Sequence, residues 1–407
     1  MDIFKIRSLF PILDEKVHGK KPLIYLDNAA TSQTPTPVVE AIESAYFHRK
    51  ANVHRGVHCL SQMATTAMET GRDAVRRFIG ASSSSEIIFT RGTTEALNLV
   101  ASSFGELLYP GDLVILTQME HHSNIVPWQL LQARRGIRIK VVPVLDDGTL
   151  DMEVYARLLE ESPRIVSVTQ ISNVLGTVNP IRRMAEMAHD AGAVFVCDGA
   201  QGVAHEQVDV EALGVDFYAF SAHKMYGPTG IGALYGKREL LEKMPPYQGG
   251  GEMIGHVSFD HGTTWADLPY KFEAGTPDFV GAAAIASAID FMENTAGIEA
   301  MKAHEDALLQ YATDKMKEAI PDIRIYGTAP DKASLISFLI PGAHHYDTGV
   351  LLDQLGIAVR TGHHCAQPLM ERFGIEGTVR ASFAVYNTFQ EIDTFIQALV
   401  RVNSMLR

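Results

Sequence analysis

Several features that define other classes of protein are scarce or missing here. Only three cysteines occur among 407 residues, Cys59, Cys197 and Cys365, and such an odd, sparse set does not build a disulfide scaffold. No apolar run approaches the roughly 18 residues that span a bilayer. The opening stretch, MDIFKIRSLFPIL, has no long apolar core of the kind found in secretory signals. We therefore expect a cytoplasmic protein without a membrane partner.

Positive charge is not in excess either. Lysine and arginine number 35 against 48 acidic residues, so the net charge is −13 with histidine neutral. This balance argues against a protein that coats nucleic acid or an anionic membrane. Hydrophobic residues make up 46% of the chain and charged residues 20%, which is close to the average of globular proteins and excludes disorder. The length predicts two or three domains, or a large domain with a smaller one.

Short β-rich runs alternate with helical stretches in the middle of the chain. Strands are predicted at residues 86–90, 113–118, 165–171, 193–197, 217–220 and 232–235. Amphipathic segments lie between several of them, for example at residues 181–191 and 201–213. This alternation predicts an α/β fold with a mainly parallel sheet covered by helices on both faces. In such sheets ligands bind beyond the carboxyl ends of the strands.

The alternation of strands and helices ends at about residue 247. Residues 247–277 are rich in glycine, threonine and aromatics and predict loops and a hairpin. Leu308, Ala312, Met316 and Ile320 then recur at a spacing of four, which predicts one face of a long helix. A further strand is expected at residues 333–340. We predict a large domain at residues 20–295 and a smaller α/β domain formed by residues 1–19 and 296–407.

Two charged residues follow successive predicted strands. Asp198 comes after the apolar run AVFVC, and Lys224 lies in SAHK after DFYAF. Both are expected at the same edge of a parallel sheet. A lysine there can form a Schiff base with an aldehyde cofactor, and a carboxylate can keep the pyridine nitrogen of pyridoxal phosphate protonated. A solvated lysine and a helix-capping aspartate are the alternative.

A candidate phosphate site precedes a predicted helix. The segment RGTTE follows a strand and supplies Thr93 and Thr94 at the start of the helix ALNLVASSF. Backbone N–H groups at a helix start bind phosphate, although either threonine can also be an ordinary helix cap. Neither the G-x-G-x-x-G pattern at a strand–helix junction nor the P-loop pattern occurs.

Histidines and Cys365 form the remaining candidates. His54 and His58 have a spacing that can serve zinc, but Gly56 lies between them and no H-E-x-x-H pattern follows, so we expect no metal. His121 can instead stack on a planar cofactor and move protons. Cys365 lies in the loop RTGHHCAQP, where adjacent histidines and Arg360 can favour the thiolate.

A set of motifs runs through nearly the whole chain in a fixed order. They are YLDNAAT, NVHRGVH, RGTTEALNLVA, QMEHHSNIVPWQ, ISNVLGT, DGAQG, DFYAFSAHKMYGPTGIGALYG, GGGEMI, FEAGTPD, RTGHHCAQPLM and VRASFAVYNT. With these motifs the sequence resembles the fold-type I, pyridoxal-phosphate-dependent enzymes of the class V aminotransferase group. More narrowly it resembles SufS-type cysteine desulfurases, also described as selenocysteine lyase-like. The resemblance implies a seven-stranded sheet in the large domain.

The resemblance also implies a role for each matching residue. Lys224 would carry the aldimine, Cys365 would attack the substrate sulfur, and His121 would stack on the cofactor ring and act as acid and base. The cofactor would further contact Thr93, Thr94, Asn173, Asp198, Gln201, Ser221 and His223. Thr276 would reach the phosphate in the partner subunit of a homodimer. Arg380, Asn173 and Arg360 would bind the substrate carboxylate, the first of them bidentately.

The implied activity is conversion of L-cysteine to L-alanine, with the sulfur held on Cys365 as a persulfide. An acceptor protein of SufE or SufU type would then take the sulfur for iron–sulfur cluster assembly. Three alternatives stay open from the residues: a selenocysteine lyase acting on L-selenocysteine, another pyridoxal phosphate reaction such as transamination, and a non-enzymatic sulfur carrier or metal-binding scaffold. Thr34 departs from the lysine found in many relatives, at a position without a catalytic role.

Overall fold

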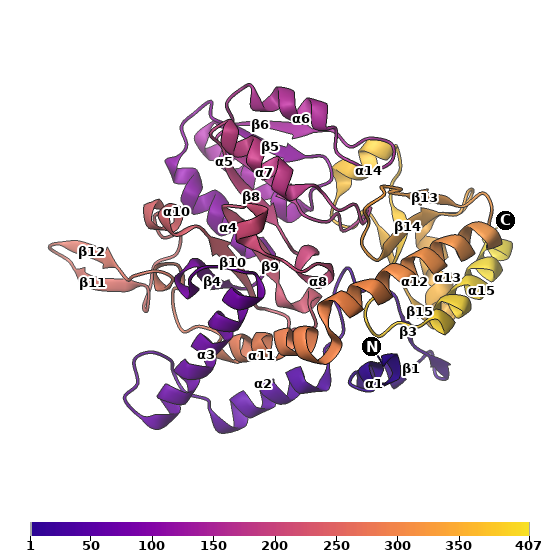
Figure 1. The fold of residues 1–407 in the computed structure, drawn as a ribbon, viewed down its shortest axis with the longest axis horizontal. Helices are drawn as coiled ribbons and strands as arrows, with labels where there is room; N and C mark the ends of the chain where they lie inside the picture. The colour runs from indigo at the N-terminus through magenta and orange to yellow at the C-terminus, as the bar shows by residue number, and fades with distance from the viewer. Residues whose placement is uncertain (1, 407) are drawn as a thin grey trace.

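The computed structural model describes residues 2–406, which form two lobes, each built on its own sheet (Figure 1). The larger lobe contains a seven-stranded sheet in the order β4-β10-β9-β8-β7-β5-β6. Its strands are β4 (Ile87–Thr90), β5 (Leu113–Thr117), β6 (Arg138–Val142), β7 (Ile165–Thr169), β8 (Val194–Asp198), β9 (Phe217–Ser221) and β10 (Gly232–Gly236). Only β10 runs antiparallel to its neighbours, so the predicted mainly parallel sheet is confirmed.

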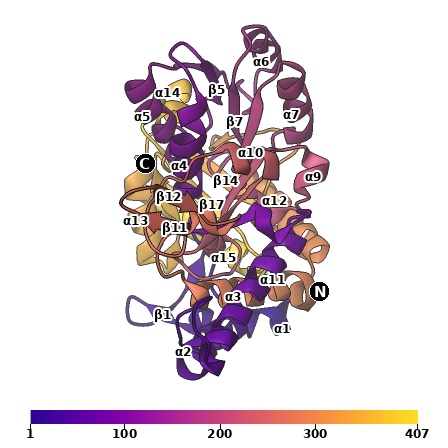
Figure 2. The same cartoon turned by 90° about the vertical axis from the view of Figure 1, so that its left-hand side faces the viewer.

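Helices cover both faces of this sheet, because successive apolar side chains along its strands point to opposite faces and both faces are therefore apolar. Leu113 and Ile115 of β5 belong to one core, whereas Val114 and Leu116 belong to the other. The first core is covered by α3 (Cys59–Phe78), α6 (Met152–Leu159), α7 (Ile181–Asp190) and α11 (Phe279–Asp290). The second is covered by α4 (Thr93–Ser103), α5 (Val126–Arg135) and α10 (Arg238–Lys243). Figure 2 shows the whole structure turned by 90° about the vertical axis of Figure 1. Helix α2 (Thr36–His48) packs on α11.

The smaller lobe contains an antiparallel sheet in the order β13-β14-β17-β16. Its strands are β13 (Arg324–Tyr326), β14 (Leu335–Leu339), β16 (Arg360–Gly362) and β17 (Thr378–Ser382). The helices of this part are α12 (Ile298–Ala319), α13 (His345–Gln354), α14 (Gln367–Phe373) and α15 (Phe389–Leu406). The expected long helix is α12, whose Leu308, Ala312 and Met316 are buried in the core of this lobe.

The amino-terminal segment joins the two lobes. It contains α1 (Ile3–Arg7), β1 (Lys16–Val17), β2 (Lys21–Pro22) and β3 (Ile24–Tyr25), and β3 pairs in parallel with β15 (Ile357–Ala358). The ring of Phe10 packs against Tyr386 at 4.7 Å between ring centroids and against Phe291 at 5.6 Å. The loop that follows β3 contacts both lobes, since the Asn28 Nδ2 donates to the Ser382 oxygen at 2.6 Å and the Ser32 N–H donates to the His223 oxygen at 3.0 Å.

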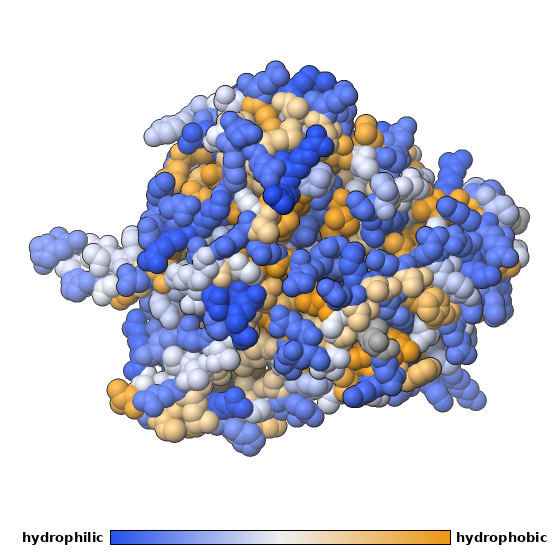
Figure 3. Space-filling view, viewed as in Figure 1, coloured by the Kyte–Doolittle hydropathy of each residue, from blue (hydrophilic) through white to orange (hydrophobic). Residues whose placement is uncertain are grey.

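Three local features differ from or extend the predictions. Strand β6 was not predicted, although Arg138 and Lys140 alternate with apolar residues as is common on an edge strand. The segment at residues 201–213 is not one helix but two short ones, α8 (Gly202–His205) and α9 (Val210–Leu213), since the Asp209 side chain caps α9 by accepting two backbone N–H groups. The expected hairpin is formed by β11 (Ile254–Ser258) and β12 (Gly262–Trp265) and projects from the body (Figure 3).

The helices between residues 2 and 406 include none that is long and apolar enough to cross a membrane.

Candidate active site

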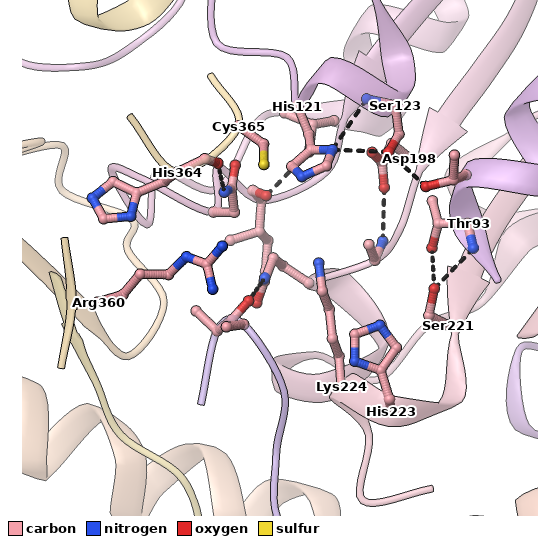
Figure 4. A pocket seen from close by; sticks show the side chains of 18 of the residues that line it. Thr93, His121, Ser123, Asp198, Ser221, His223, Lys224, Arg360, His364 and Cys365 are labelled. Carbon is pink, nitrogen blue, oxygen red and sulfur yellow. Dashed lines mark hydrogen bonds between the residues drawn. The ribbon is translucent and has the colours of Figure 1, made fainter. Parts of the chain in front are cut away.

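A cavity of about 210 Å³ lies where the carboxyl ends of the larger sheet face the smaller lobe (Figure 4). Strands β4, β5, β7, β8 and β9 all run in the same direction, so the segments that follow them meet at this edge. Of the predicted site residues the cavity is lined by Thr93, Thr94, His121, Asn173, Asp198, Gln201, Ser221, His223, Lys224, Arg360, Cys365 and Arg380. Only Thr276 lies elsewhere.

Lys224 and Asp198 are the charged pair at the floor of the cavity. Asp198 ends β8 and stands in register with Ala219 of the neighbouring β9, and Lys224 follows β9. Among residues 2–406 the Lys224 amine has neither a hydrogen-bond nor an ion-pair partner, and it points into the cavity. Burial lowers the pKa of Lys224 to about 8, although the Asp198 carboxylate opposes this change. Burial likewise raises the pKa of Asp198 above its usual range. Lys224 is therefore suited to add to an aldehyde.

The amino end of α4 forms a cradle of hydrogen-bond donors. The Ser221 hydroxyl lies 2.8 Å from both the backbone nitrogen and the hydroxyl of Thr93. Gly92 has φ 139°, and a Cβ atom there would lie 2.9 Å from the Ser221 Oγ. The Thr94 hydroxyl bonds that of Ser123 over 2.7 Å. Only glycine lets the backbone approach the Ser221 hydroxyl so closely. The backbone N–H groups and hydroxyls gathered at this helix start are suited to bind a phosphate group.

His121 presents its ring to the cavity in a defined tautomer. Its Nδ1 accepts the backbone N–H of Ser123 at 3.1 Å, which leaves the proton of the neutral ring on Nε2. Burial lowers the pKa of His121 to about 3, with a further contribution from Lys224. A neutral imidazole at this place can stack on a planar group and transfer a proton at Nε2. Ser123 was not predicted, because its contacts with the Thr94 hydroxyl and the His121 ring are seen only in the folded chain.

Arg380 carries a buried positive charge on the other side of the cavity. Its Nη1 donates to the backbone oxygen of Asn173 at 2.7 Å, and its Nη2 donates to Asp27 Oδ1 at 3.1 Å. Its Nε is buried without a hydrogen-bond partner within residues 2–406. Arg360 lies 3.9 Å from the second Asp27 oxygen. The two guanidinium groups can receive a carboxylate, and Asp27, which sequence reasoning missed, holds them in place.

Two amide side chains among the predicted residues are engaged with the backbone. The Gln201 Nε2 donates to the Ala29 oxygen at 2.7 Å. The Asn173 Nδ2 donates to the His364 oxygen at 2.9 Å, so Asn173 contacts the loop that carries Cys365. Both side chains are thereby oriented before any ligand binds.

Cys365 lies on the loop between β16 and α14. His364 and Cys365 have φ values of 51° and 58°, a left-handed conformation that is uncommon outside glycine. This backbone directs the sulfur toward the cavity, on the side facing His121 (Figure 4). Cys197 is instead buried in β8, and Cys59 is exposed at the start of α3. Cys365 is therefore the one cysteine placed to react with a ligand of this cavity.

Thr276 and the candidate metal histidines lie outside the cavity. Thr276 lines a separate hollow of about 370 Å³ together with Arg91 and Glu95. The His54 ring bonds Glu69 at 3.1 Å, and the His58 ring caps α3. In the described part of the chain, no three histidine, cysteine, aspartate or glutamate side chains are grouped to hold a metal ion.

The donor set of the cavity fits pyridoxal 5′-phosphate. The helix start with its hydroxyls suits the phosphate, and Asp198 suits a protonated ring nitrogen. Lys224, with its pKa of about 8, suits the aldehyde. The His121 ring faces the space between these groups and can stack on a flat ring.

Comparison with known proteins agrees with this geometry. The family model of the class-V aminotransferases matches residues 24–395. A cysteine desulfurase of Dickeya dadantii (strain 3937) is 50% identical over 405 residues, which cover 99% of this chain and 97% of that protein. The apo structure of a cysteine desulfurase from Thermococcus onnurineus NA1 aligns with a TM-score of 0.94 at 40% identity and covers 99% of this chain and 98% of its own. The structure of the Escherichia coli cysteine desulfurase CsdA (S-sulfonic acid) aligns with a TM-score of 0.90 at 39% identity and covers 100% of this chain and 100% of its own.

Proposed function

Because the chain belongs to the class-V aminotransferase family and is a pyridoxal-phosphate-dependent cysteine desulfurase, we propose that Cys365 takes the sulfur of L-cysteine as a persulfide. One observation carries this proposal. Cys365 is a partly exposed thiol that lines the same cavity as the unpartnered Lys224 amine. A thiol across the cavity from the amine that binds the aldehyde can reach the sulfur of a substrate held between them.

The residues around the cofactor have separable roles in this proposal. Pyridoxal phosphate, when bound, supplies an aldehyde for the amine and a ring that withdraws electrons from the substrate. Lys224 binds the aldehyde and carries a proton to and from the substrate α-carbon. Asp198 holds the proton of the ring nitrogen, and Gln201 contacts the ring hydroxyl. Thr93, Thr94, Ser221 and His223 hold the phosphate, and His121 stacks on the ring and moves a proton at Nε2.

Arg380 orients the substrate, with Arg360 and Asn173 beside it. Its buried guanidinium can bind a carboxylate bidentately, and its fixed bonds to Asp27 and Asn173 keep the group from turning away. The substrate side chain would then extend toward Cys365. This arrangement supports a small α-amino acid as the substrate and gives the thiol direct access to its β-substituent.

The sulfur step balances without an added oxidant. The Cys365 thiolate attacks the substrate sulfur and forms an S–S bond. The C–S bond breaks, its electron pair goes to the β-carbon, and that carbon takes a proton. L-cysteine and the Cys365 thiol thus become L-alanine and a persulfide. Thiol exchange with an acceptor protein restores Cys365.

The partners of the reaction form the next part of the proposal. We infer an acceptor protein of SufE or SufU type, and iron–sulfur cluster assembly as the destination, because Cys365 lies on a short loop and is partly exposed. We also propose that the enzyme is a cysteine desulfurase of the SufS type. A cytoplasmic location is supported by the three free cysteines, since such thiols persist in a reducing compartment.

A homodimer is proposed for the complete site. Thr276 lies in a hollow separate from its own chain's phosphate cradle. The family resemblance implies that it binds the phosphate of the partner subunit. Light scattering should give a dimer mass, and Thr276→Ala should weaken cofactor retention in a dimer of unchanged mass. A monomer with full activity would overturn this part.

Mass analysis of Cys365 tests the central proposal. The holoenzyme is incubated with L-cysteine and mapped under non-reducing conditions, with Cys365→Ser as the comparison. We expect one added sulfur on the Cys365 peptide and alanine in the solution, and loss of cysteine desulfuration in the variant. An unmodified Cys365 beside stoichiometric alanine would indicate a lyase that releases sulfur or selenium directly. Full activity of Cys365→Ser would show that the nucleophile is another group.

A further inference from the structure

His122 lies next to His121 but contacts a different part of the site. Its backbone N–H donates to the Cys365 oxygen at 2.7 Å. Its ring Nε2 accepts the backbone N–H of Gln367 at 3.2 Å, at the first residue of α14. The His363 ring lies beside it, with 5.5 Å between centroids. One residue of the larger lobe thus binds the backbone at two points directly after the Cys365 side chain, the Cys365 oxygen and the Gln367 N–H.

We propose that His122 is the positioning residue that fixes the Cys365 loop against the larger lobe. The inference rests on the proposed role of Cys365 and adds a residue that acts through the nucleophile without touching the substrate. Because His121 and His122 are consecutive, the segment that presents a ring to the cavity also sets the position of the Cys365 sulfur in it. A displacement of His121 therefore also displaces His122, and the reverse.

The conformation of the loop explains why such an anchor is required. Positive φ angles at both His364 and Cys365 are unfavourable for residues with a Cβ atom, so external bonds must hold them. Asn173 holds the His364 oxygen, and the Thr378 hydroxyl lies 2.9 Å from the His364 ring. Both of these bonds act on residue 364. His122 acts on the second strained residue, Cys365, and on Gln367 beyond it, and thereby fixes the direction of the thiol.

The bond from Gln367 requires an unprotonated Nε2 on His122. Burial and the neighbouring His363 both lower the pKa of His122, which keeps the ring neutral and able to accept. A side chain that provides an acceptor at a similar distance from the backbone should replace it. Glutamine does so through its Oε1, whereas alanine does not.

Three variants of the full-length holoenzyme test the proposal: His122→Ala, His122→Gln and the control Asp209→Ala. Asp209 also accepts backbone N–H groups at a helix start, but α9 precedes β9 and lies at the opposite edge of the sheet from the cavity. Hydrogen exchange is measured for residues 363–368, together with the rate at which iodoacetamide labels Cys365. Single-turnover persulfide formation is followed by mass.

We expect His122→Ala to raise exchange and Cys365 labelling about tenfold and to slow persulfide formation by roughly tenfold to a hundredfold, because misplacing a reacting group by about 1 Å has an effect of this size. His122→Gln should restore most of each value, and Asp209→Ala should change none of them. Wild-type loop exchange in His122→Ala, or no rescue by glutamine, would overturn the proposal. Absence of a persulfide in the wild type, with a loosened loop in His122→Ala, would overturn the role of Cys365 and leave the anchoring role of His122 intact.

Discussion

Arg380 on β17 and Asp27, which follows β3, form an ion pair although they lie 353 residues apart in the sequence. The Arg380 guanidinium is buried, and its Nη2 lies 3.1 Å from Asp27 Oδ1. Burial raises the pKa of Asp27, while the two guanidinium groups of Arg380 and Arg360 lower it. The pair therefore fixes Arg380, for which we propose a role in binding the substrate carboxylate, and ties the amino-terminal segment to β17 at the same time.

Removing Asp27 should loosen this arginine and destabilise the fold. Asp27→Ala leaves a buried charge without its carboxylate partner, and because the Asp27 side chain is 21% exposed we expect a loss of about 2 kcal/mol in the free energy of unfolding. The KM for L-cysteine should rise more than kcat falls. Urea unfolding and steady-state kinetics measure the two effects.

Asp146→Ala provides the matched control for that variant. It removes the carboxylate of another arginine pair, with Arg372, but the Asp146 side chain is 97% exposed. We expect a change of less than about 0.5 kcal/mol. Equal losses in the two variants would mean that the Asp27–Arg380 pair adds nothing specific.

The reaction of Lys224 with the cofactor should depend on pH in a recognisable way. Burial lowers the pKa of Lys224 to about 8, and only the unprotonated amine attacks an aldehyde. In cofactor-free protein the rate of pyridoxal phosphate binding should therefore rise from pH 6.5 and level off above about pH 9. Stopped-flow absorbance between about pH 6.5 and 10 measures this profile. A rate that still rises tenfold per pH unit above about pH 9 would indicate an ordinary lysine.

Lys224→Ala should separate covalent attachment from binding. The variant should lose turnover but keep the cofactor by non-covalent contacts with the α4 cradle and Asp198. Lys332→Ala is the control, because burial lowers the pKa of Lys332 to about 8 as well, yet this lysine donates to the Gly327 oxygen away from the cavity. Borohydride reduction followed by peptide mapping should label Lys224 in the control and no lysine in Lys224→Ala. Alanine production by Lys224→Ala at the wild-type rate would contradict the assigned mechanism.

Local patterns predicted the parts of the fold that depend on neighbours in sequence. The strand ends that present Asp198 and Lys224 follow from apolar runs whose buried residues are contiguous, and the face of α12 follows from its spacing of four. Residues 201–213 were mispredicted because the Asp209 cap competes with the helix that their apolar pattern favours. Periodicity reports which face is buried and says nothing of such a side-chain bond.

The site residues that sequence analysis missed were missed for one physical reason. Asp27 and His122 act through partners hundreds of positions away, Arg380 and Gln367, and no local pattern marks such a contact. The family resemblance named Arg380 and Cys365 because they meet the ligand. It named Asn173, which contacts both Arg380 and the Cys365 loop, but it did not name Asp27 or His122, whose contacts become visible only in the folded chain.

Gly92 offers a stringent test of the phosphate cradle. Its φ of 139° is open almost only to glycine, and an added Cβ would lie 2.9 Å from the Ser221 Oγ. Gly92→Ala should therefore displace either the Ser221 hydroxyl or the start of α4. We expect about 2 kcal/mol lower stability and roughly tenfold weaker binding of pyridoxal phosphate, which corresponds to about 1.4 kcal/mol. Equilibrium dialysis and thermal unfolding measure these changes.

Gly214→Ala separates crowding in the cradle from backbone strain in general. Gly214 has φ 69°, and its Cβ would meet no atom within 4 Å. It ends α9, at the edge of the sheet opposite the cavity. This variant should lose about 1 kcal/mol of stability and retain wild-type affinity for the cofactor. If Gly92→Ala binds pyridoxal phosphate as tightly as Gly214→Ala does, then the amino end of α4 does not hold the phosphate, because a displaced Ser221 hydroxyl would otherwise weaken that contact.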